Sequence, residues 1–175
     1  MSIGNKQYRV VIADDVEEVR ESLRRVLEPN GYDAFLVPNG EFAIQIALKA
    51  QPDLIILDIT MPGISGFETA QELRRHPETA DVPLMFITGD TDVQTLVQAF
   101  EVGAVDYITK PFNKTLLKAR VEASLEKKVL RDQEEIYLSR IEEDKKQSLE
   151  WLRKFLPGNA ASQIMSTGKV QPRRY

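Results

Sequence analysis

The stretch LIILDITMPGISG, residues 54–66, decides the fold of this chain. Four apolar residues, 54–57, lead directly into the carboxylate of Asp58, and a proline and two glycines follow within the stretch. A run this apolar is typical of a strand in the middle of a parallel sheet, where both faces are buried. A charge at the end of such a strand is costly to bury unless it is paired or bound to a metal. The stretch therefore predicts a central strand that carries Asp58 to a site where other groups compensate its charge.

The composition excludes several kinds of function. The chain has 175 residues, 42% hydrophobic and 29% charged, which fits one domain with an attached segment or two small domains. The net charge of -4 argues against a general nucleic-acid binder. The lack of cysteine excludes disulfides, thiolate nucleophiles and cysteine zinc sites, and the single histidine, His76, is expected in a loop. Without an apolar run of signal-peptide or membrane-spanning length, we expect a cytoplasmic protein with no membrane insertion.

Short apolar runs alternate with amphipathic stretches up to about residue 125. They predict strands at 8–14, 33–39, 54–59, 83–89 and 106–111, and helices after Asp15, over 40–50, over 67–75, over 93–100 and after Asn113. We expect Asp15 to cap the first helix, Val16 to lie on its buried face and Phe42 to point inward from the second helix. Parallel crossovers need helices, so the alternation predicts a doubly wound α/β fold with a five-stranded parallel sheet covered on both faces.

Charged and hydroxyl side chains follow the predicted strands. They are Asp14 and Asp15 after the first strand, Asp58 at the third, Thr88 at the fourth and Lys110 at the fifth. Because the carboxyl ends of parallel strands meet at one edge of the sheet, these groups should converge there. Clustered carboxylates raise one another's pKa unless a cation neutralises them, and an all-oxygen ligand set suits Mg²⁺.

An edge of this kind can hold a phosphoryl group. The metal and Lys110 would neutralise its oxygens, Thr88 would donate a hydrogen bond, and a central carboxylate could attack phosphorus. Asp58 lies on the middle strand between the other groups, so it is the best candidate for that nucleophile.

Four motifs carry a resemblance to a known family. They are VVIADD (10–15), LIILDITMPGISG (54–66), PLMFITG (83–89) and GAVDYITKPFN (103–113). Through them the chain from about residue 7 to 128 resembles the receiver domain of two-component response regulators. The resemblance implies a flavodoxin-like sheet with strand order 2-1-3-4-5 and a histidine kinase or phosphotransfer protein as partner.

The resemblance also implies roles for individual residues. Asp58 would be the phosphoacceptor, and Lys110, joined to Pro111 by a cis peptide bond, would contact the phosphoryl group. Thr88 and Tyr107 would form the switch pair. Mg²⁺ would be held by Asp15, Asp58 and the backbone carbonyl of Thr60, with Asp14 assisting through water. Thr60 and Asp90 would flank the site and tune dephosphorylation.

The chain changes character near residue 125. From there to 156 almost half of the residues are charged, and glycine and proline are absent. A row at heptad spacing is formed by Leu116, Ala123, Leu130, Tyr137 and Trp151, with Ile141 in a second row and Asp144 interrupting the first. The pattern fits a long solvated helix or a coiled coil between two chains, parallel or antiparallel. So little apolar surface makes a lone helix marginal, which favours a homodimer.

The expected organisation is a tail at 1–7, a receiver domain at 8–125, a helical coiled-coil extension at 126–156 and a linker at 157–175. The linker pattern Leu156-Pro157, Ala161, Ile164 and Gly168 resembles the segment that precedes class III adenylate and guanylate cyclase domains. This resemblance implies a cyclase output domain outside the chain, whereas the chain itself is a regulatory module and not an enzyme.

Three other functions are compatible with parts of the sequence. A stand-alone dimeric adaptor would act through the helix alone. A transcription factor is disfavoured because residues 126–175 show no helix-turn-helix and only a small basic cluster, Lys169, Arg173 and Arg174. A phosphatase with an aspartyl nucleophile would need a substrate cap, and no insertion is large enough to form one.

Overall fold

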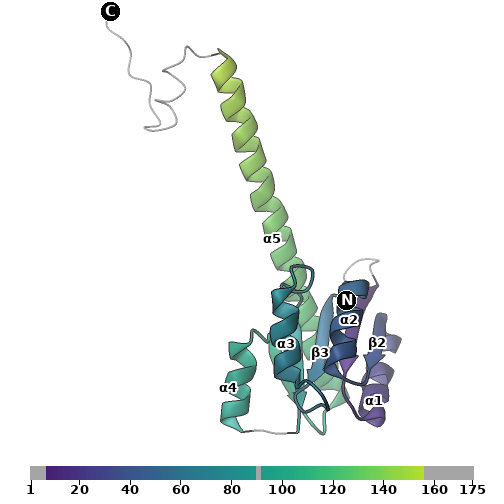
Figure 1. Cartoon of the computed structure of the whole chain (residues 1–175). Coiled ribbons are helices and arrows are strands. Elements are labelled where there is room, and N and C mark those ends of the chain that lie inside the picture. The colour runs from purple at the N-terminus through teal and green to yellow at the C-terminus, as the bar shows by residue number, and fades with distance from the viewer. Residues whose placement is uncertain (1–6, 90–91, 156–175) are drawn as a thin grey trace, which may run out of the picture. The chain divides into compact units, whose positions relative to one another are not determined.

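The computed structural model describes residues 7–89 and 92–155 of the chain, which form a five-stranded sheet, the helices around it and a long last helix. The elements are β1 Tyr8–Ala13, α1 Glu17–Leu27, a 3-10 turn at Glu28–Asn30, β2 Tyr32–Val37, α2 Gly40–Ala50, β3 Leu54–Asp58, α3 Gly66–Arg75, β4 Leu84–Thr88, α4 Val93–Glu101, β5 Asp106–Thr109 and α5 Lys114–Phe155. The strand order is β2-β1-β3-β4-β5 and all neighbouring pairs are parallel, which confirms the predicted fold (Figure 1).

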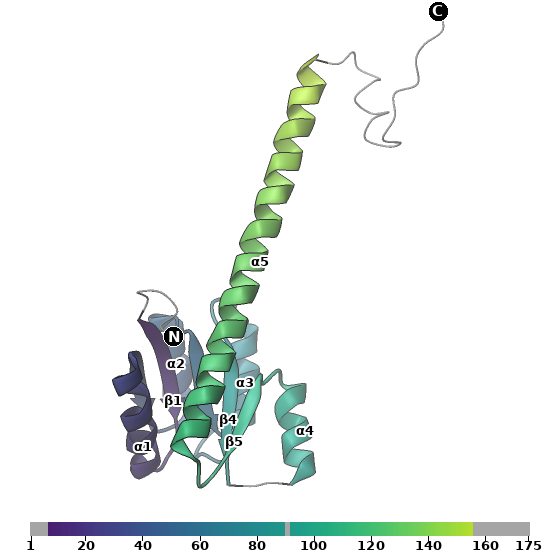
Figure 2. The same ribbon diagram turned by 180° about the vertical axis from the view of Figure 1, so that it is seen from behind.

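The sheet is buried on both faces because its central strands are apolar at every position. All five residues of β3 and of β4 are buried. On one face, residues such as Leu57 and Phe86 pack under α2 and α3. On the other face, residues such as Ile56 and Ile87 pack against α1 and the first part of α5 (Figure 2). The two apolar layers fix the middle strand in place, so its last residue, Asp58, emerges at a defined point of the edge.

Three details of the helices differ from the sequence-based expectation. Phe42 is 49% exposed, because α2 turns Ala43 and Ala47 toward the sheet and Phe42 lies about 100° away from Ala43 around the helix. Val16 is 43% exposed, because it is the extended N-cap residue of α1 and lies before the helical periodicity begins. Asp15 does not cap this helix; the carboxylate of Asp14 accepts a hydrogen bond from the Val16 amide at 2.9 Å instead.

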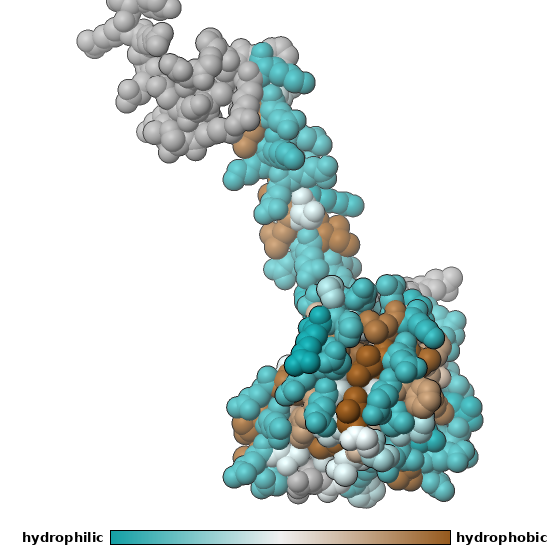
Figure 3. Space-filling view, viewed as in Figure 1, coloured by the Kyte–Doolittle hydropathy of each residue, from teal (hydrophilic) through white to brown (hydrophobic). Residues whose placement is uncertain are grey.

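The chain divides into two units, one up to Val129 and one from Leu130 onward. In the first unit, α5 buries Leu117, Val121 and Leu125 against the sheet. In the second unit, the helix exposes its apolar side chains among charged ones (Figure 3). These exposed side chains are Leu130, Ile136, Tyr137, Leu138, Ile141 and Trp151.

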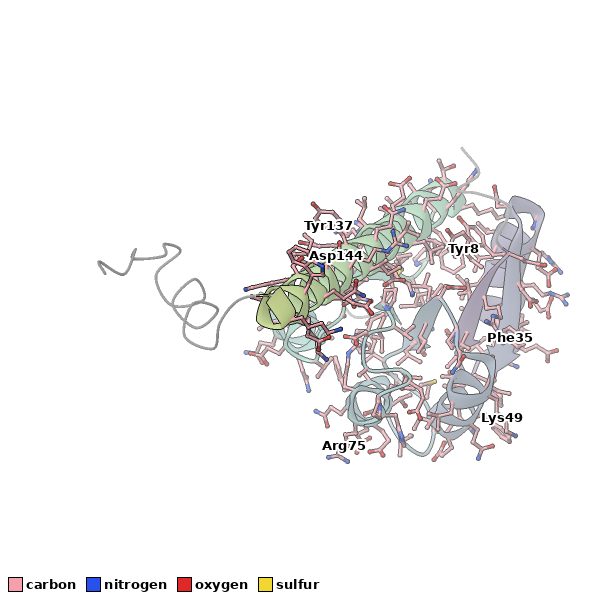
Figure 4. The ribbon with its side chains drawn as sticks, turned by 90° about the horizontal axis from the view of Figure 1, so that it is seen from above. Tyr8, Phe35, Lys49, Arg75, Tyr137 and Asp144 are labelled. Atoms are coloured by element: carbon pink, nitrogen blue, oxygen red, sulfur yellow. The ribbon has the colours of Figure 1, made fainter. Side chains whose placement is uncertain are left out.

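The heptad row is exposed throughout the part of it that the structure describes. Leu116 is 47% exposed, Leu130 65% and Tyr137 64%. Tyr137 and the interrupting Asp144 both project from this part of α5 (Figure 4). The row is therefore available for a partner, while the coiled coil itself stays a prediction.

Some predicted features lie outside the described residues: Asp90, the linker pattern from Leu156 to Gly168, and the basic cluster of Lys169, Arg173 and Arg174. Among the residues described, no helix combines the length and the apolar character needed to cross a membrane.

Candidate functional site

The predicted site residues lie at one edge of the sheet. Strand pairing aligns Ala13 with Leu57, Asp58 with Ile87, and Thr88 with Thr109. The next residues along the chain, Asp14 and Asp15 after β1 and Lys110 after β5, therefore lie near the end of the central strand.

Three carboxylates gather at this edge. One oxygen each from Asp14, Asp15 and Asp58 lies within 4.8 Å of the others. Asp14 is only 1% exposed and Asp58 6%, whereas Asp15 is exposed. Two nearly buried acids and one exposed acid therefore form a cluster of negative charge at this edge.

Lys110 is the cation that compensates this charge. Its Nζ lies 2.6 Å from Asp14 Oδ2 and 3.1 Å from Asp58 Oδ1. Its backbone amide donates to the carbonyl of Thr88 at 2.7 Å, and the Lys110–Pro111 peptide bond is cis, as predicted. The sequence placed Lys110 near the phosphoryl site but did not reveal that its closer partner is Asp14.

Both the backbone and the side chain of Asp14 form hydrogen bonds with neighbouring groups. Its amide donates to the Val37 carbonyl, its carbonyl accepts from Arg20 Nη1 at 2.5 Å, and its Oδ1 accepts from Val16. Within the described residues, its buried Oδ2 accepts no well-directed hydrogen bond and has only the ionic contact with Lys110. One buried carboxylate oxygen thus keeps coordinating capacity beyond its contact with Lys110.

The electrostatics follow from burial and charge. Burial raises the pKa of the Asp58 carboxyl, and the charges of Asp14 and Asp15 raise it further, although Lys110 acts in the opposite direction. Burial alone would lower the pKa of the Lys110 ammonium, but its contacts with the carboxylates of Asp14 and Asp58 outweigh burial and raise it. The site therefore keeps its lysine charged and makes ionisation of Asp58 costly unless further positive charge is present.

The loop after Asp58 is shaped by glycines and a capping box. Gly66 donates its amide to the Ile59 carbonyl at 2.9 Å, and a Cβ at Gly66 would lie 2.1 Å from the backbone oxygen of Asp58. Ser65 and Glu68 exchange hydrogen bonds that begin α3. This close return of the chain holds the backbone of Asp58 in position. Thr60 lies exposed in the same loop, and the orientation of its carbonyl toward an ion stays a prediction.

The predicted switch residues lie on the same face of the sheet. Thr88 is 2% exposed. Strand alternation places it on the face of Phe86, the residue paired with Tyr107. Tyr107 is half-buried; its ring packs edge-on against Phe100 of α4 at 6.0 Å, and the guanidinium of Arg120 lies 6.0 Å from its centre. The contact with Arg120 was not predicted, and only the opposite charges of Asp106 and Arg120 hinted at it.

Comparison with known proteins agrees with this fold. Residues 10–122 match the response regulator receiver domain family, and the chain belongs to this family.

The curated relatives are longer than this chain. It is 40% identical over 116 residues to the phosphate regulon transcriptional regulatory protein PhoB of Pseudomonas aeruginosa, which covers 66% of this chain and 51% of the relative. It is 39% identical over 117 residues to the DNA-binding dual master transcriptional regulator RpaA of Synechocystis, covering 67% and 48%. The chain thus spans about half the length of the curated relatives it matches.

Solved receiver structures match almost over their full length. The signal receiver domain of a modulated diguanylate cyclase from Desulfovibrio desulfuricans is 33% identical, with a TM-score of 0.65, covering 72% of this chain and 99% of that one. The chemotaxis protein CheY4 of Vibrio cholerae is 28% identical, with a TM-score of 0.66, covering 68% and 99%.

Proposed function

We propose that this chain is a phosphorylation-dependent signalling receiver whose Asp58 accepts a phosphoryl group from a histidine kinase or a phosphotransfer protein. The observation that carries the proposal is the position of Asp58. It ends the central strand, is almost buried, lies 3.1 Å from Lys110 and shares a cluster with two further acids. Membership in the receiver family supports the same role.

The acid cluster fits a magnesium ion. Its donors are oxygens alone, and the buried Oδ2 of Asp14 has coordinating capacity left over. Asp15, Asp58 and the main-chain carbonyl of Thr60 would hold the ion, with Asp14 assisting through water. When bound, Mg²⁺ supplies positive charge to the oxygens of the transferring phosphoryl group.

The residues of the chain have distinct parts in the transfer. A carboxylate oxygen of Asp58 attacks phosphorus, the bond between phosphorus and the donor breaks, and its electron pair leaves with the donor. The product is an aspartyl phosphate. Lys110 then neutralises a phosphoryl oxygen, and the Thr88 hydroxyl donates a hydrogen bond to the group. Thr60 and Asp90 are proposed to tune the rate at which this product is hydrolysed.

Phosphorylation acts by shifting a population between two conformations. With the phosphoryl group in place, Thr88 moves inward and Tyr107 becomes buried behind it. This changes the surface formed by β5 and its neighbouring helices. The helix α5 follows β5 directly and continues beyond the domain. A conformational change at β5 can therefore be transmitted along α5 to an output domain or a partner.

We infer that the second unit of α5 pairs with the same helix of a second copy. Its exposed apolar row and its mixed charges support pairing with a like helix. The output is proposed to be a nucleotide cyclase beyond the linker, because of the linker pattern. A solved receiver whose name assigns it to a diguanylate cyclase gives general support for a receiver joined to a cyclase. The alternative is a dimeric adaptor without such a domain, and the reading frame after Tyr175 distinguishes the two.

Labelling tests the phosphoacceptor. With Mg²⁺ and acetyl phosphate, the wild-type chain should be labelled and Asp58→Asn should not, because the amide is no nucleophile. Asp33→Asn, which changes an exposed acid on β2, is the matched control and should be labelled normally. Persistent labelling of Asp58→Asn would place the phosphoacceptor elsewhere.

Sedimentation equilibrium tests the helix pairing. Ile141→Glu puts a charge into the proposed seam and should weaken the dimer at least tenfold. Ile136→Glu changes a residue of similar exposure on another side of the helix and should have a much smaller effect. Equal effects of the two variants, or a wild-type monomer at every concentration, would refute this pairing.

A further inference from the structure

The side chain of Tyr107 is held from two sides. From α4, Phe100 packs against it edge-on, with an angle of 80° between the rings. From α5, the guanidinium carbon of Arg120 lies 6.0 Å from the ring centre, within the range of a cation–π contact. Phe100 is itself 51% exposed, so the ring of Tyr107 lies near the surface between the two helices.

Arg120 is also tied to the backbone of Tyr107. Its Nη1 forms an ion pair with Asp106 Oδ1, and the same oxygen accepts the amide of Tyr107 at 2.8 Å. One carboxylate oxygen thus links the guanidinium of α5 to the peptide of β5 on which Tyr107 sits. The side chains of Arg120 and Asp106 are 35% and 23% exposed, so this arrangement is partly shielded from water.

Arg120 lies where α5 is anchored to the domain. Leu117 and Val121, which flank it, are fully buried against the sheet, and the carbonyl of Arg120 accepts the hydroxyl of Ser124 at 2.9 Å. A change in the contacts of Arg120 therefore acts on a helix that continues past the domain.

We propose that Arg120 is a positioning residue that holds Tyr107 in its half-buried place between α4 and α5 and thereby opposes the switch. This role rests on the proposed function: burial of Tyr107 in the switch must first break the contact between its ring and Arg120. Arg120 would then keep its ion pair with Asp106 and lose the second of its two side-chain contacts with β5. The contact with α5 thus stabilises the unphosphorylated conformation. A partner that binds α5 would therefore shift the equilibrium between the two conformations of Tyr107.

The competing explanation is that Arg120 only forms an ion pair with Asp106. The two explanations differ in whether the Tyr107 ring depends on Arg120. An ion pair with Asp106 needs only a positive charge, so lysine can replace arginine. Holding the ring at the same time favours the broad guanidinium, which can face a ring while it donates hydrogen bonds, whereas a lysine ammonium paired with Asp106 acts as a compact point charge. The two explanations therefore predict different results for Arg120→Lys, which keeps the positive charge but removes the guanidinium group.

The test uses the full chain labelled with 3-fluorotyrosine and observed by fluorine NMR. The Tyr107 resonance is assigned as the one missing from Tyr107→Phe. Its position and its shift between H₂O and D₂O, which reports solvent exposure of the ring, are measured for wild type, Arg120→Gln and Arg120→Lys. Arg140→Gln, an exposed arginine in the second unit of the same helix, is the matched control. Each sample is measured with Mg²⁺ alone and with Mg²⁺ plus beryllium fluoride.

With Mg²⁺ alone, Arg120→Gln should change the exposure of Tyr107 and shift its conformational equilibrium about two- to fivefold toward the beryllium fluoride position, as expected for loss of one cation–π contact. Arg120→Lys should behave like Arg120→Gln, and Arg140→Gln like wild type. An unchanged Tyr107 resonance in Arg120→Gln, or full rescue by lysine, would overturn the positioning role.

The wild-type NMR samples, together with the labelling of Asp58, report separately on the proposed function. If wild type shows no response to beryllium fluoride and no labelling of Asp58, the switch is refuted. In that case a changed Tyr107 resonance in Arg120→Gln without the phosphate mimic would still support the contact, while the movement of Tyr107 would have to be abandoned.

Discussion

Lys110 is the residue whose loss should disturb the site most. Replacing it by methionine leaves the nearly buried Asp14 and Asp58 side by side without a cation. We expect Lys110→Met to lower the free energy of unfolding at pH 7 by about 2 kcal/mol, less than for a fully buried pair because Lys110 is partly exposed. Urea unfolding measures the effect.

The control for this variant is Lys118→Met. Lys118 forms an exposed pair with Glu122 at 3.8 Å, and its replacement should change stability by less than about 0.5 kcal/mol. If both variants lost the same stability, the compensating role of Lys110 would be disproved.

Asp58 gives the site a pH dependence with a definite sign. Because its pKa is raised in the folded protein, the folded state binds the extra proton between the unfolded and the folded pKa. The contribution of this carboxyl to stability therefore falls as the pH rises through that window and stays low above it. Asp58→Asn cannot ionise and avoids this loss.

We therefore expect the unfolding free energy of Asp58→Asn, measured without Mg²⁺, to exceed that of wild type increasingly from about pH 4 upward and then to level off. The measurement is urea unfolding at a series of pH values. Mg²⁺ should narrow or reverse the difference, because the ion stabilises only the protein that binds it. A difference independent of pH would contradict the raised pKa.

At the scale of elements, the return of the chain at Gly66 fixes the end of β3. A Cβ at this position would meet the backbone oxygen of Asp58 at 2.1 Å and the Cα of Ile59 at 2.9 Å. We expect Gly66→Ala to cost about 1–3 kcal/mol in urea unfolding and to reduce Asp58 labelling, since backbone atoms must shift.

Gly89, after β4, provides the comparison. A Cβ there would have no atom within 4 Å, so Gly89→Ala should change stability by about 0.5 kcal/mol or less. If Gly66→Ala and Gly89→Ala lost similar amounts of unfolding free energy, a steric clash with the Asp58 backbone would not be the reason for glycine at position 66.

The sequence was sufficient to predict the elements and most of the edge. Apolar runs that end in charged residues mark buried parallel strands, and the parallel arrangement then brings Asp14, Asp58 and Lys110 together. It was not sufficient for single side chains of short helices. Phe42 differs from a buried neighbour by one position, and periodicity over eleven residues does not fix which side faces the sheet.

Contacts between side chains far apart in the sequence could not be predicted for another reason. The contact of Arg120 with the Tyr107 ring and the shorter distance of Lys110 to Asp14 depend on which rotamers the packed helices leave open. Residue types and spacing show only that opposite charges exist. The pairing of α5 is a prediction that sedimentation equilibrium tests, and coordination of an ion by the Thr60 carbonyl is a further prediction.

At the scale of the whole molecule, the receiver carries its own core. Every buried hydrophobic side chain in the described part of the chain lies between Tyr8 and Leu125. We expect residues 1–129 alone to unfold cooperatively, with a free energy of unfolding within about 1 kcal/mol of that of the domain in the full chain, and to keep Asp58 labelling. Urea unfolding and sedimentation equilibrium would test this, and the shortened chain should be monomeric.

Loss of cooperative unfolding in the shortened chain would show that the second unit is needed for the fold. A dimer that persists without the second unit would move the pairing surface to the receiver. Either result would change the role proposed for α5.

The charges gathered around Asp58 have a consequence for what can approach it. Three carboxylates and one ammonium leave this edge with a formal charge of minus two. A divalent cation cancels that charge, whereas a single monovalent ion leaves half of it. A phosphoryl donor is itself an anion, so we expect the bare edge to repel it and an edge neutralised by a divalent ion to repel it less. Under the proposed function, neutralisation of this charge would be a condition for phosphorylation of Asp58, and the supply of divalent ions would be a second input beside the phosphoryl donor.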